Sequence, residues 1–184
     1  MASRIEAAAS SNERSMIQVW DPVVRLFHWS LVAAFATAWF AEEGEMLHEG
    51  AGYVVLALLA IRLVWGVIGT RYARFADFVR SPGTVTRYLI DILGGHPRRY
   101  LGHNPAGGAM VLALIGMCAL AAGSGWLMTT DAFWGTKWVE ALHEISANAT
   151  LAFIALHVLG VLLTSWQHKE NLVGAMITGR KRAD

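Results

Sequence analysis

Four long apolar segments limit this chain to one class of fold. They cover roughly residues 23–41, 47–69, 107–129 and 138–166, and each has 19 or more residues. An α-helix of that length crosses a hydrocarbon core about 30 Å thick. The segments are too long for strands and lack the two-residue alternation of a half-buried sheet. We therefore predict an all-α membrane protein, a four-transmembrane-helix bundle.

Composition excludes several other classes of protein. Only 16% of the 184 residues are charged, against about 25% in a typical soluble domain. A net charge of +1 gives no basis for nucleic-acid binding. The single cysteine excludes disulfides within the chain, cysteine-rich zinc sites and iron–sulfur clusters. No CxxCH motif is present, so a covalently attached c-type haem is excluded as well.

The distribution of basic residues predicts the orientation of the spans. Lysine and arginine gather between the second and third spans and near both termini, whereas the other two links are acidic. By the positive-inside rule, both termini and the middle loop are cytoplasmic. We divide the chain into a polar N-terminal tail (1–17), the transmembrane domain (18–168) and a basic cytoplasmic C-terminal tail (169–184).

Two short amphipathic segments accompany the spans. Ser81 followed by Pro82 is typical of a helix start, and it predicts a short helix ending near Leu93. The C-terminal tail contains a similar segment, ENLVGAMITGRKR. We expect both to lie along the cytoplasmic membrane interface.

Four histidines lie in or at the ends of the apolar spans, where ionisable residues are costly and often functional. His143 and His157 are 14 residues apart, which puts them on nearly the same helix face and about 21 Å apart in depth. His28 starts the first span on the cytoplasmic side, and His48 starts the second on the outer side. Depth therefore pairs His28 with His157 and His48 with His143.

The chemistry of a two-histidine site favours one kind of cofactor. A zinc ion normally needs four nitrogen or sulfur ligands, which two histidines within lipid do not supply. A b-type haem brings four nitrogens of its own and needs only one or two axial histidines. We therefore favour haem over a bare metal ion. With both axial positions filled by histidine, such a centre transfers electrons and has no open position for a substrate.

Several motifs extend this interpretation to a family. They are VWDPVVRLFHWSLV in the first span, LHEGAGYVVLALLAIRLVWGVIG in the second, YLGHNPAGGAMVLAL before the third and LHEISANATLAFIALHVLGVLL in the fourth. Over roughly residues 19–182 the chain resembles the bacterial cytochrome b561 family, which includes the cytochrome b subunits of nickel–iron hydrogenases. The resemblance implies two non-covalent haem b groups, whose ligands map onto His28, His48, His143 and His157. It also implies a location in the bacterial inner membrane. Only 20 residues separate His28 from His48, fewer than is usual in hydrogenase-type subunits, which makes a hydrogenase partner less favoured.

Other residues are candidates for supporting roles. Arg62 lies 14 residues after His48 and could bind a haem propionate or extend to the interface. Arg25, three residues before His28, could bind a propionate or a lipid phosphate. Gly52, four residues after His48, would let a porphyrin approach or would let two helices pack closely. His103 is expected to have an interfacial polar role, with a quinone or propionate contact as the alternative.

The predicted outer links are acidic, with seven carboxylates against one base, Lys137. A focused negative patch attracts a positively charged partner, so we expect a periplasmic c-type cytochrome or another haem protein there. The predicted function is electron transfer between that partner and the membrane quinone pool. Two alternatives are an oxidoreductase that reacts with quinone or superoxide at its own site, and a haem-free membrane scaffold. Membrane lipid is an expected partner, and a homodimer is left open.

Overall fold

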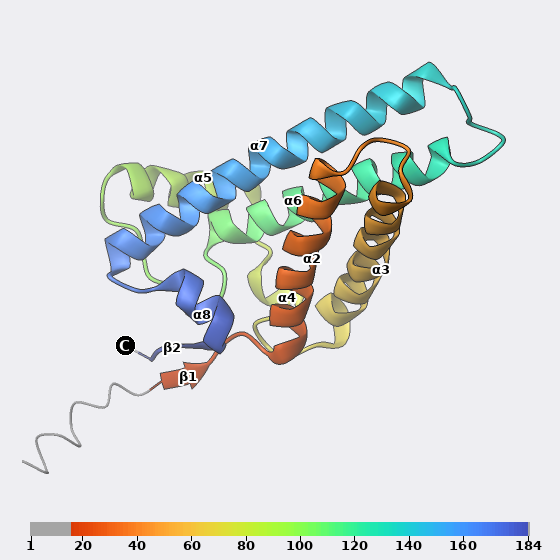
Figure 1. The fold of residues 1–184 in the computed structure, drawn as a ribbon. Coiled ribbons are helices and arrows are strands. Elements are labelled where there is room, and N and C mark those ends of the chain that lie inside the picture. The colour runs from red at the N-terminus through yellow and green to blue at the C-terminus, as the bar shows by residue number, and fades with distance from the viewer. Residues whose placement is uncertain (1–15, 184) are drawn as a thin grey trace, which may run out of the picture.

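The structure, a computed structural model, describes residues 16–183. Seven helices and two short strands form in this part of the chain (Figure 1). Most of the predicted N-terminal tail, residues 1–15, lies outside the described residues.

Four of the helices are long and apolar enough to span a membrane. They are α2 (Pro22–Phe40), α3 (Met46–Ile68), α6 (Pro105–Met128) and α7 (Lys137–His168). The predicted fold class is therefore confirmed, and the predicted spans differ from the helices by at most two residues at either end.

Side-chain caps explain where α2, α5 (Pro82–Leu93) and α6 begin. Asp21, Ser81 and Asn104 each accept a hydrogen bond from the backbone N–H three residues later, and each is followed by proline. Proline suits the first helical position because its fixed φ fits the helix and its missing N–H would have no partner there. The sequence pattern thus predicts these starts.

The four spans form two helical hairpins that pack through α3 and α6 (Figure 1). The first hairpin is α2 and α3, and the second is α6 and α7. A buried apolar cluster joins the hairpins and consists of Ala34, Val55, Leu59 and Cys118. Cys118 is therefore a core residue, as its place within an apolar span suggests. α7 packs along α6 and makes few close contacts with α2 or α3.

Asp21 joins the start of α2 to the end of α3. Besides capping α2, its carboxylate accepts hydrogen bonds from Trp65 Nε1 at 3.1 Å and Thr70 Oγ1 at 2.6 Å. Burial acts to raise the pKa of Asp21, but the hydrogen bonds from Thr70, Val24 and Trp65 outweigh it and lower the pKa. Asp21 therefore stays ionised and holds the first hairpin together at this end.

Three shorter helices and two strands lie at this same end of the bundle. The helices are α4 (Phe75–Phe78), α5 and α8 (Leu172–Thr178). Strand β1 (Met16–Gln18) pairs antiparallel with β2 (Arg180–Arg182), so the two ends of the described chain meet. α5 and α8 are present where the amphipathic segments predict them, and their cytoplasmic location stays a prediction. α4 was not predicted, and the end of the second segment forms strand β2.

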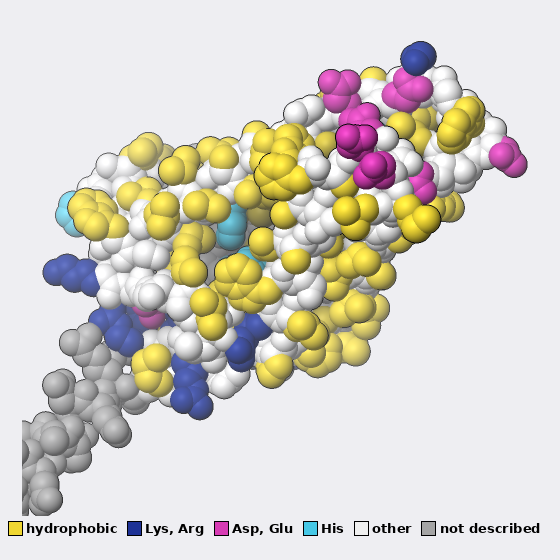
Figure 2. Space-filling model, viewed as in Figure 1, with side chains coloured by type: hydrophobic (Ala, Val, Ile, Leu, Met, Phe, Trp, Pro, Cys, Tyr) yellow, Lys and Arg dark blue, Asp and Glu magenta, His cyan; other side chains and the backbone are white. Residues whose placement is uncertain are grey.

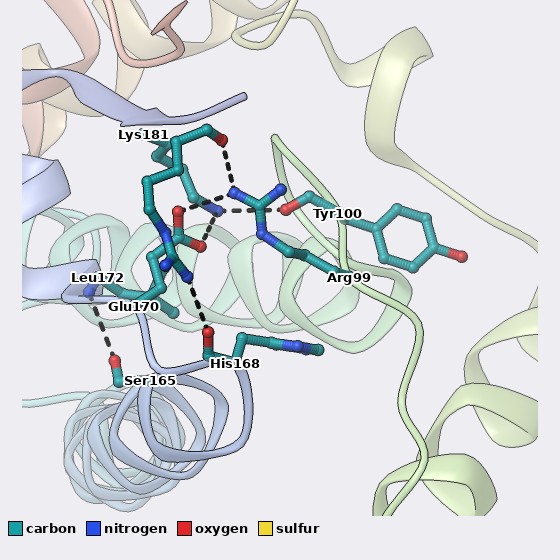
Figure 3. A network of polar contacts seen from close by, with 8 residues as sticks. Arg99, Tyr100, Ser165, His168, Glu170, Leu172 and Lys181 are labelled. Atoms are coloured by element: carbon teal, nitrogen blue, oxygen red, sulfur yellow. Dashed lines mark hydrogen bonds and ion pairs between the residues drawn. The ribbon is translucent and has the colours of Figure 1, made fainter. Parts of the chain in front are cut away.

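A buried ionic cluster anchors the C-terminal strand (Figure 3). Glu170 bonds Arg99 at 3.0 Å and Lys181 at 3.3 Å, and the side chains of Glu170 and Lys181 are almost fully buried. Lys181 Nζ also donates to the Tyr100 carbonyl, and Arg99 donates to the Arg182 carbonyl. The cluster ties the link before α6, the end of α7 and strand β2 to one another.

Charged side chains separate to opposite ends of the molecule (Figure 2). Acidic side chains gather around the α2–α3 and α6–α7 links, and basic ones gather near the chain ends. Between these ends the surface is mainly apolar, as expected for helices that face lipid.

Candidate functional site

The first histidine pair lies toward the acidic end, where His48 of α3 faces His143 of α7. Their ring centroids are 6.0 Å apart. His48 Nδ1 lies 2.8 Å from the carbonyl oxygen of Ala38, and His143 Nδ1 lies 2.8 Å from that of Ala121. A carbonyl only accepts, so each Nδ1 must carry the proton and donate it. Both Nε2 atoms are then left with a lone pair for a metal.

Gly125 of α6 leaves room for the His143 ring. A Cβ atom at position 125 would lie 3.1 Å from His143 Cε1 and 3.2 Å from Nδ1. The ring would have to move, and its hydrogen bond to Ala121 would move with it. The glycine therefore helps to position His143.

The second pair lies toward the basic end, where His28 of α2 faces His157 of α7. Their ring centroids are 6.4 Å apart, and the His28 ring also meets the edge of Trp29 at 5.0 Å. His28 Nδ1 is buried and has no hydrogen-bond partner among residues 16–183. The second pair thus lacks the carbonyl contact that orients His48 and His143.

Both centroid separations suit two imidazoles that share one metal ion. With metal–nitrogen bonds of about 2 Å and about 1.1 Å from each nitrogen to its ring centroid, opposed rings lie about 6.2 Å apart. The observed values of 6.0 and 6.4 Å are close to that figure. In residues 16–183, no group of three or more His, Cys, Asp or Glu side chains could hold a bare metal ion. The donor set therefore fits haem, which supplies its own four equatorial nitrogens.

The packing leaves space beside both pairs. Because α7 makes few close contacts with α2 or α3, the histidines face one another across a gap between the hairpins. Figure 2 shows histidine side chains inside a hollow near the middle of the surface in view. A Cβ atom at Gly52 or at Gly116 would meet no atom within 4 Å, so these glycines border open space. Gly52 therefore makes no close helix contact here, and its place beside a porphyrin stays a prediction.

Arg62 is buried in α3, with 3% of its surface exposed. It donates from Nη2 to the Ala73 carbonyl at 3.0 Å and lies over the Phe75 ring at 4.8 Å. Its Nη1 has no partner among residues 16–183, and neither does the buried Nε of Arg25. Arg62 therefore does not extend to the interface, and both arginines keep donors free for an anionic group.

His103 precedes α6 and packs between two aromatic rings. Its ring centroid is 4.7 Å from that of Trp20 and 4.5 Å from that of Phe78. Burial, reinforced by the positive charge of Arg62, lowers the pKa of His103 to about 3. His103 is consequently a neutral side chain at neutral pH, and it lies inside the fold more deeply than an interfacial role suggests.

Comparison with known proteins identifies relatives over nearly the whole chain. A sequence model of the family described as prokaryotic cytochrome b561 matches residues 19–179. A probable Ni/Fe-hydrogenase B-type cytochrome subunit of Rhodobacter capsulatus is 22% identical, with 96% of this chain and 85% of the relative covered. A protein of the same description from Azotobacter vinelandii is 23% identical, with 91% of this chain and 89% of the relative covered. No solved structure matches the chain significantly.

The structure adds groups that sequence reasoning missed. The carbonyls of Ala38 and Ala121 cannot be recognised from the sequence as hydrogen-bond partners, because every residue has a carbonyl. Gly125 is one of several glycines in α6, and its contact with His143 depends on how α6 packs against α7.

Proposed function

This chain belongs to the prokaryotic cytochrome b561 family, and from that premise we propose that it carries electrons across a bacterial membrane through two bis-histidine haem b groups. Membrane electron transfer with haem b is the activity that the family name and the four apolar helices support. The two haems and their ligands are our proposal. The observation that carries it is the spacing of the two facing pairs, 6.0 and 6.4 Å between ring centroids.

In this proposal each residue has a defined task. His48 and His143 offer Nε2 to an outer haem, while their Nδ1 protons stay on the Ala38 and Ala121 carbonyls. His28 and His157 offer the ligands of an inner haem about 21 Å away along α7. Each haem, when bound, supplies a one-electron couple at its iron. The apolar spans around the pairs exclude water and hold the ligand rings in place.

Three further residues are proposed to support the haems: Arg62, Arg25 and Gly52. Arg62, with a free Nη1, is proposed to donate to a propionate of the inner haem, and Arg25 is proposed to do the same from its free Nε. An ionised carboxylate so close to the apolar core needs such a partner. Gly52 is proposed to give the outer porphyrin room beside His48.

The acidic end is the proposed docking surface for a periplasmic electron partner. Six carboxylates there have no salt bridge within residues 16–183: Glu42, Glu43, Glu45, Glu49, Asp131 and Glu144. The seventh, Glu140, bonds Lys137 at 2.8 Å. Such a surface attracts a basic c-type cytochrome and repels anionic superoxide, which favours a protein partner over superoxide chemistry. Quinone is the proposed partner at the basic end, which we place in the cytoplasm.

A second candidate is the cytochrome b subunit of a nickel–iron hydrogenase, because the curated relatives carry that description. Against it stand the 20-residue spacing of His28 and His48 and the length of the alignments. These run over 214–225 positions, more than the 184 residues of this chain, so the relatives contain insertions. Co-purification of hydrogenase subunits with the tagged protein from its native membrane would favour this candidate.

A haem assay on the purified protein tests the main proposal. The pyridine haemochrome spectrum, divided by protein concentration, should give two haem b per chain. One haem per chain, or no b-type α-band, contradicts the proposal, and absence of haem would favour the scaffold. Stopped-flow mixing of the reduced protein with a basic c-type cytochrome, at low and high salt, then tests the partner. Its rate should fall steeply with salt.

A further inference from the structure

A basic hollow lies at the end of the bundle that carries both chain ends. Its volume is about 460 Å³, and it is formed by the segment that links α3 to α5 and by the segment that links α5 to α6. Its charged lining consists of Arg71, Arg80, Arg98, Arg99 and Asp77. Four guanidinium groups thus share one hollow with a single carboxylate.

Most of this positive charge is not compensated. The Asp77 carboxylate bonds Arg74, which is outside the lining, and Arg99 bonds Glu170. Arg80 donates only to backbone carbonyls, those of Val79 and Asp77.

Arg71 and Arg98 have still fewer partners. Within residues 16–183, neither forms a hydrogen bond or an ion pair. Their guanidinium carbons lie 5.6 Å from the Tyr72 ring and 5.8 Å from the Tyr100 ring. Three guanidinium groups without a carboxylate, those of Arg71, Arg80 and Arg98, therefore surround the hollow.

Arginine in this arrangement selects phosphate. Its planar fork of donors fits two phosphate oxygens at once, and a stacked tyrosine holds the fork in place. Basic pockets at the ends of membrane helices are known binding sites for anionic lipid head groups. The chemistry of the hollow thus suits a phosphate that carries no competing positive charge.

The surroundings of the hollow suit the rest of a phospholipid. α5 adjoins it, since Tyr88 of α5 packs against Tyr100 with ring centroids 5.7 Å apart. The same helix exposes Leu89, Ile90 and Leu93, which offer acyl chains an apolar surface. A free phosphate ion would make no use of that surface.

We propose that this hollow binds the head-group phosphate of an anionic phospholipid, held chiefly by Arg71 and Arg98. The acyl chains lie along the exposed apolar side chains of α5. None of the four paired histidines lines the hollow.

Lipid binding to two matched double variants tests this proposal. Purified full-length protein is stripped of lipid by detergent exchange and titrated with phosphatidylglycerol, with phosphatidylcholine or with inorganic phosphate, and bound adducts are counted by native mass spectrometry. Arg71→Gln with Arg98→Gln should weaken phosphatidylglycerol binding roughly 30-fold, at about 1 kcal/mol for each arginine. The control, Arg87→Gln with Arg180→Gln, removes two exposed charges from the same end and should change it less than threefold.

The outcomes separate the sources of phosphate. Preference for phosphatidylglycerol over phosphatidylcholine, lost in the first variant alone, supports the proposal. Equal binding of the two lipids, or equal losses in the two double variants, overturns it. Inorganic phosphate that binds as tightly as phosphatidylglycerol would assign the hollow to a free ion. Loss of a co-purified quinone, with lipid binding unchanged, would assign it to quinone. Circular dichroism confirms that each variant is folded.

Discussion

The two histidine pairs have the same spacing but different surroundings. At the acidic end, both Nδ1 atoms donate to carbonyls, those of Ala38 and Ala121. At the basic end, His28 Nδ1 is buried without a partner, and the buried guanidinium of Arg62 is in the same region of the bundle. A hydrogen-bonded imidazole is a stronger electron donor to a metal, and a nearby positive charge favours the reduced state.

This difference sets an order for the two proposed haems. The outer site should stabilise oxidised iron, and the inner site should stabilise reduced iron. Electrons would then pass downhill from the acidic end to the basic end, which agrees with a periplasmic donor and a quinone acceptor. Five experiments test this difference, in order of decreasing expected effect.

Removing one ligand of the outer pair should affect only the outer haem. His143→Ala should eliminate the outer haem and leave the inner one, so that haem content falls from two per chain to one. His96→Ala, outside the spans, is the control and should retain both haems. The pyridine haemochrome assay measures both variants. Two haems in each variant would mean that the ligand assignment is wrong.

Disrupting the buried ionic cluster tests whether the basic end is stabilised independently of the acidic end. Glu170→Gln leaves Arg99 and Lys181 buried without a counter-charge, and it should lower the free energy of unfolding by about 3 kcal/mol. Thermal unfolding measures this loss. Hydrogen exchange should rise first in β1 and β2, whereas the region of His48 should be unaffected. Equal loosening of both ends would show that the two regions are not independent.

Low pH should destabilise the same part of the fold as Glu170→Gln does. Burial acts to raise the pKa of Glu170, but Arg99 and Lys181 outweigh it, so the pKa is lowered from its ordinary value of 4.5. A lowered pKa means that this carboxylate stabilises the fold above pH 4.5 and that the contribution is lost as pH falls through the folded value. The buried Lys181, whose own pKa is lowered by burial, then lacks its partner. Melting temperatures of wild type and Glu170→Gln should therefore converge only once the pH falls below the lowered folded pKa of Glu170.

A substitution at Arg62 tests the effect of its positive charge on the inner site. Arg62→Met keeps much of the side-chain volume and removes one positive charge. At a separation of about 10 Å and an effective dielectric constant near 20, the inner midpoint potential should fall by about 70 mV. A spectroelectrochemical titration measures both haems, and the outer potential is the internal control. If the outer potential moves instead, the assignment of Arg62 to the inner site is wrong.

A substitution at Gly125 tests the role of the hydrogen-bonded His143 ring at the outer site. Gly125→Ala brings a Cβ atom to 3.1 Å from the His143 ring and should weaken haem affinity at the outer site about tenfold. Gly123→Ala is a matched control, because its Cβ would meet no atom within 4 Å. Transfer of haem to an excess of apomyoglobin measures the loss. Equal rates for the two variants would remove the positioning role of Gly125.

Much of the fold could be predicted because its signals are local. Asp21, Ser81 and Asn104, each followed by proline, indicate where helices begin, and apolar length indicates which helices span. The strand pair was not predictable, since three residues such as Met16–Gln18 carry no pattern of their own. Its stability comes from Gly179, whose carbonyl accepts from Val19 and Trp20, and from the buried Lys181. The Gly179 contacts link residues about 160 positions apart, and the contact of Lys181 with Tyr100 links residues 81 positions apart.

The sequence alone determined the four spans, the separation of charge and the depth of each histidine, because helical rise and hydropathy depend only on residue order. What surrounds each histidine depends on the tertiary packing. The Ala38 and Ala121 carbonyls, the room at Gly125 and the burial of Arg62 depend on how one helix packs against another. Two pairs that are equivalent by spacing therefore differ in hydrogen bonding and charge, because these come from neighbouring helices.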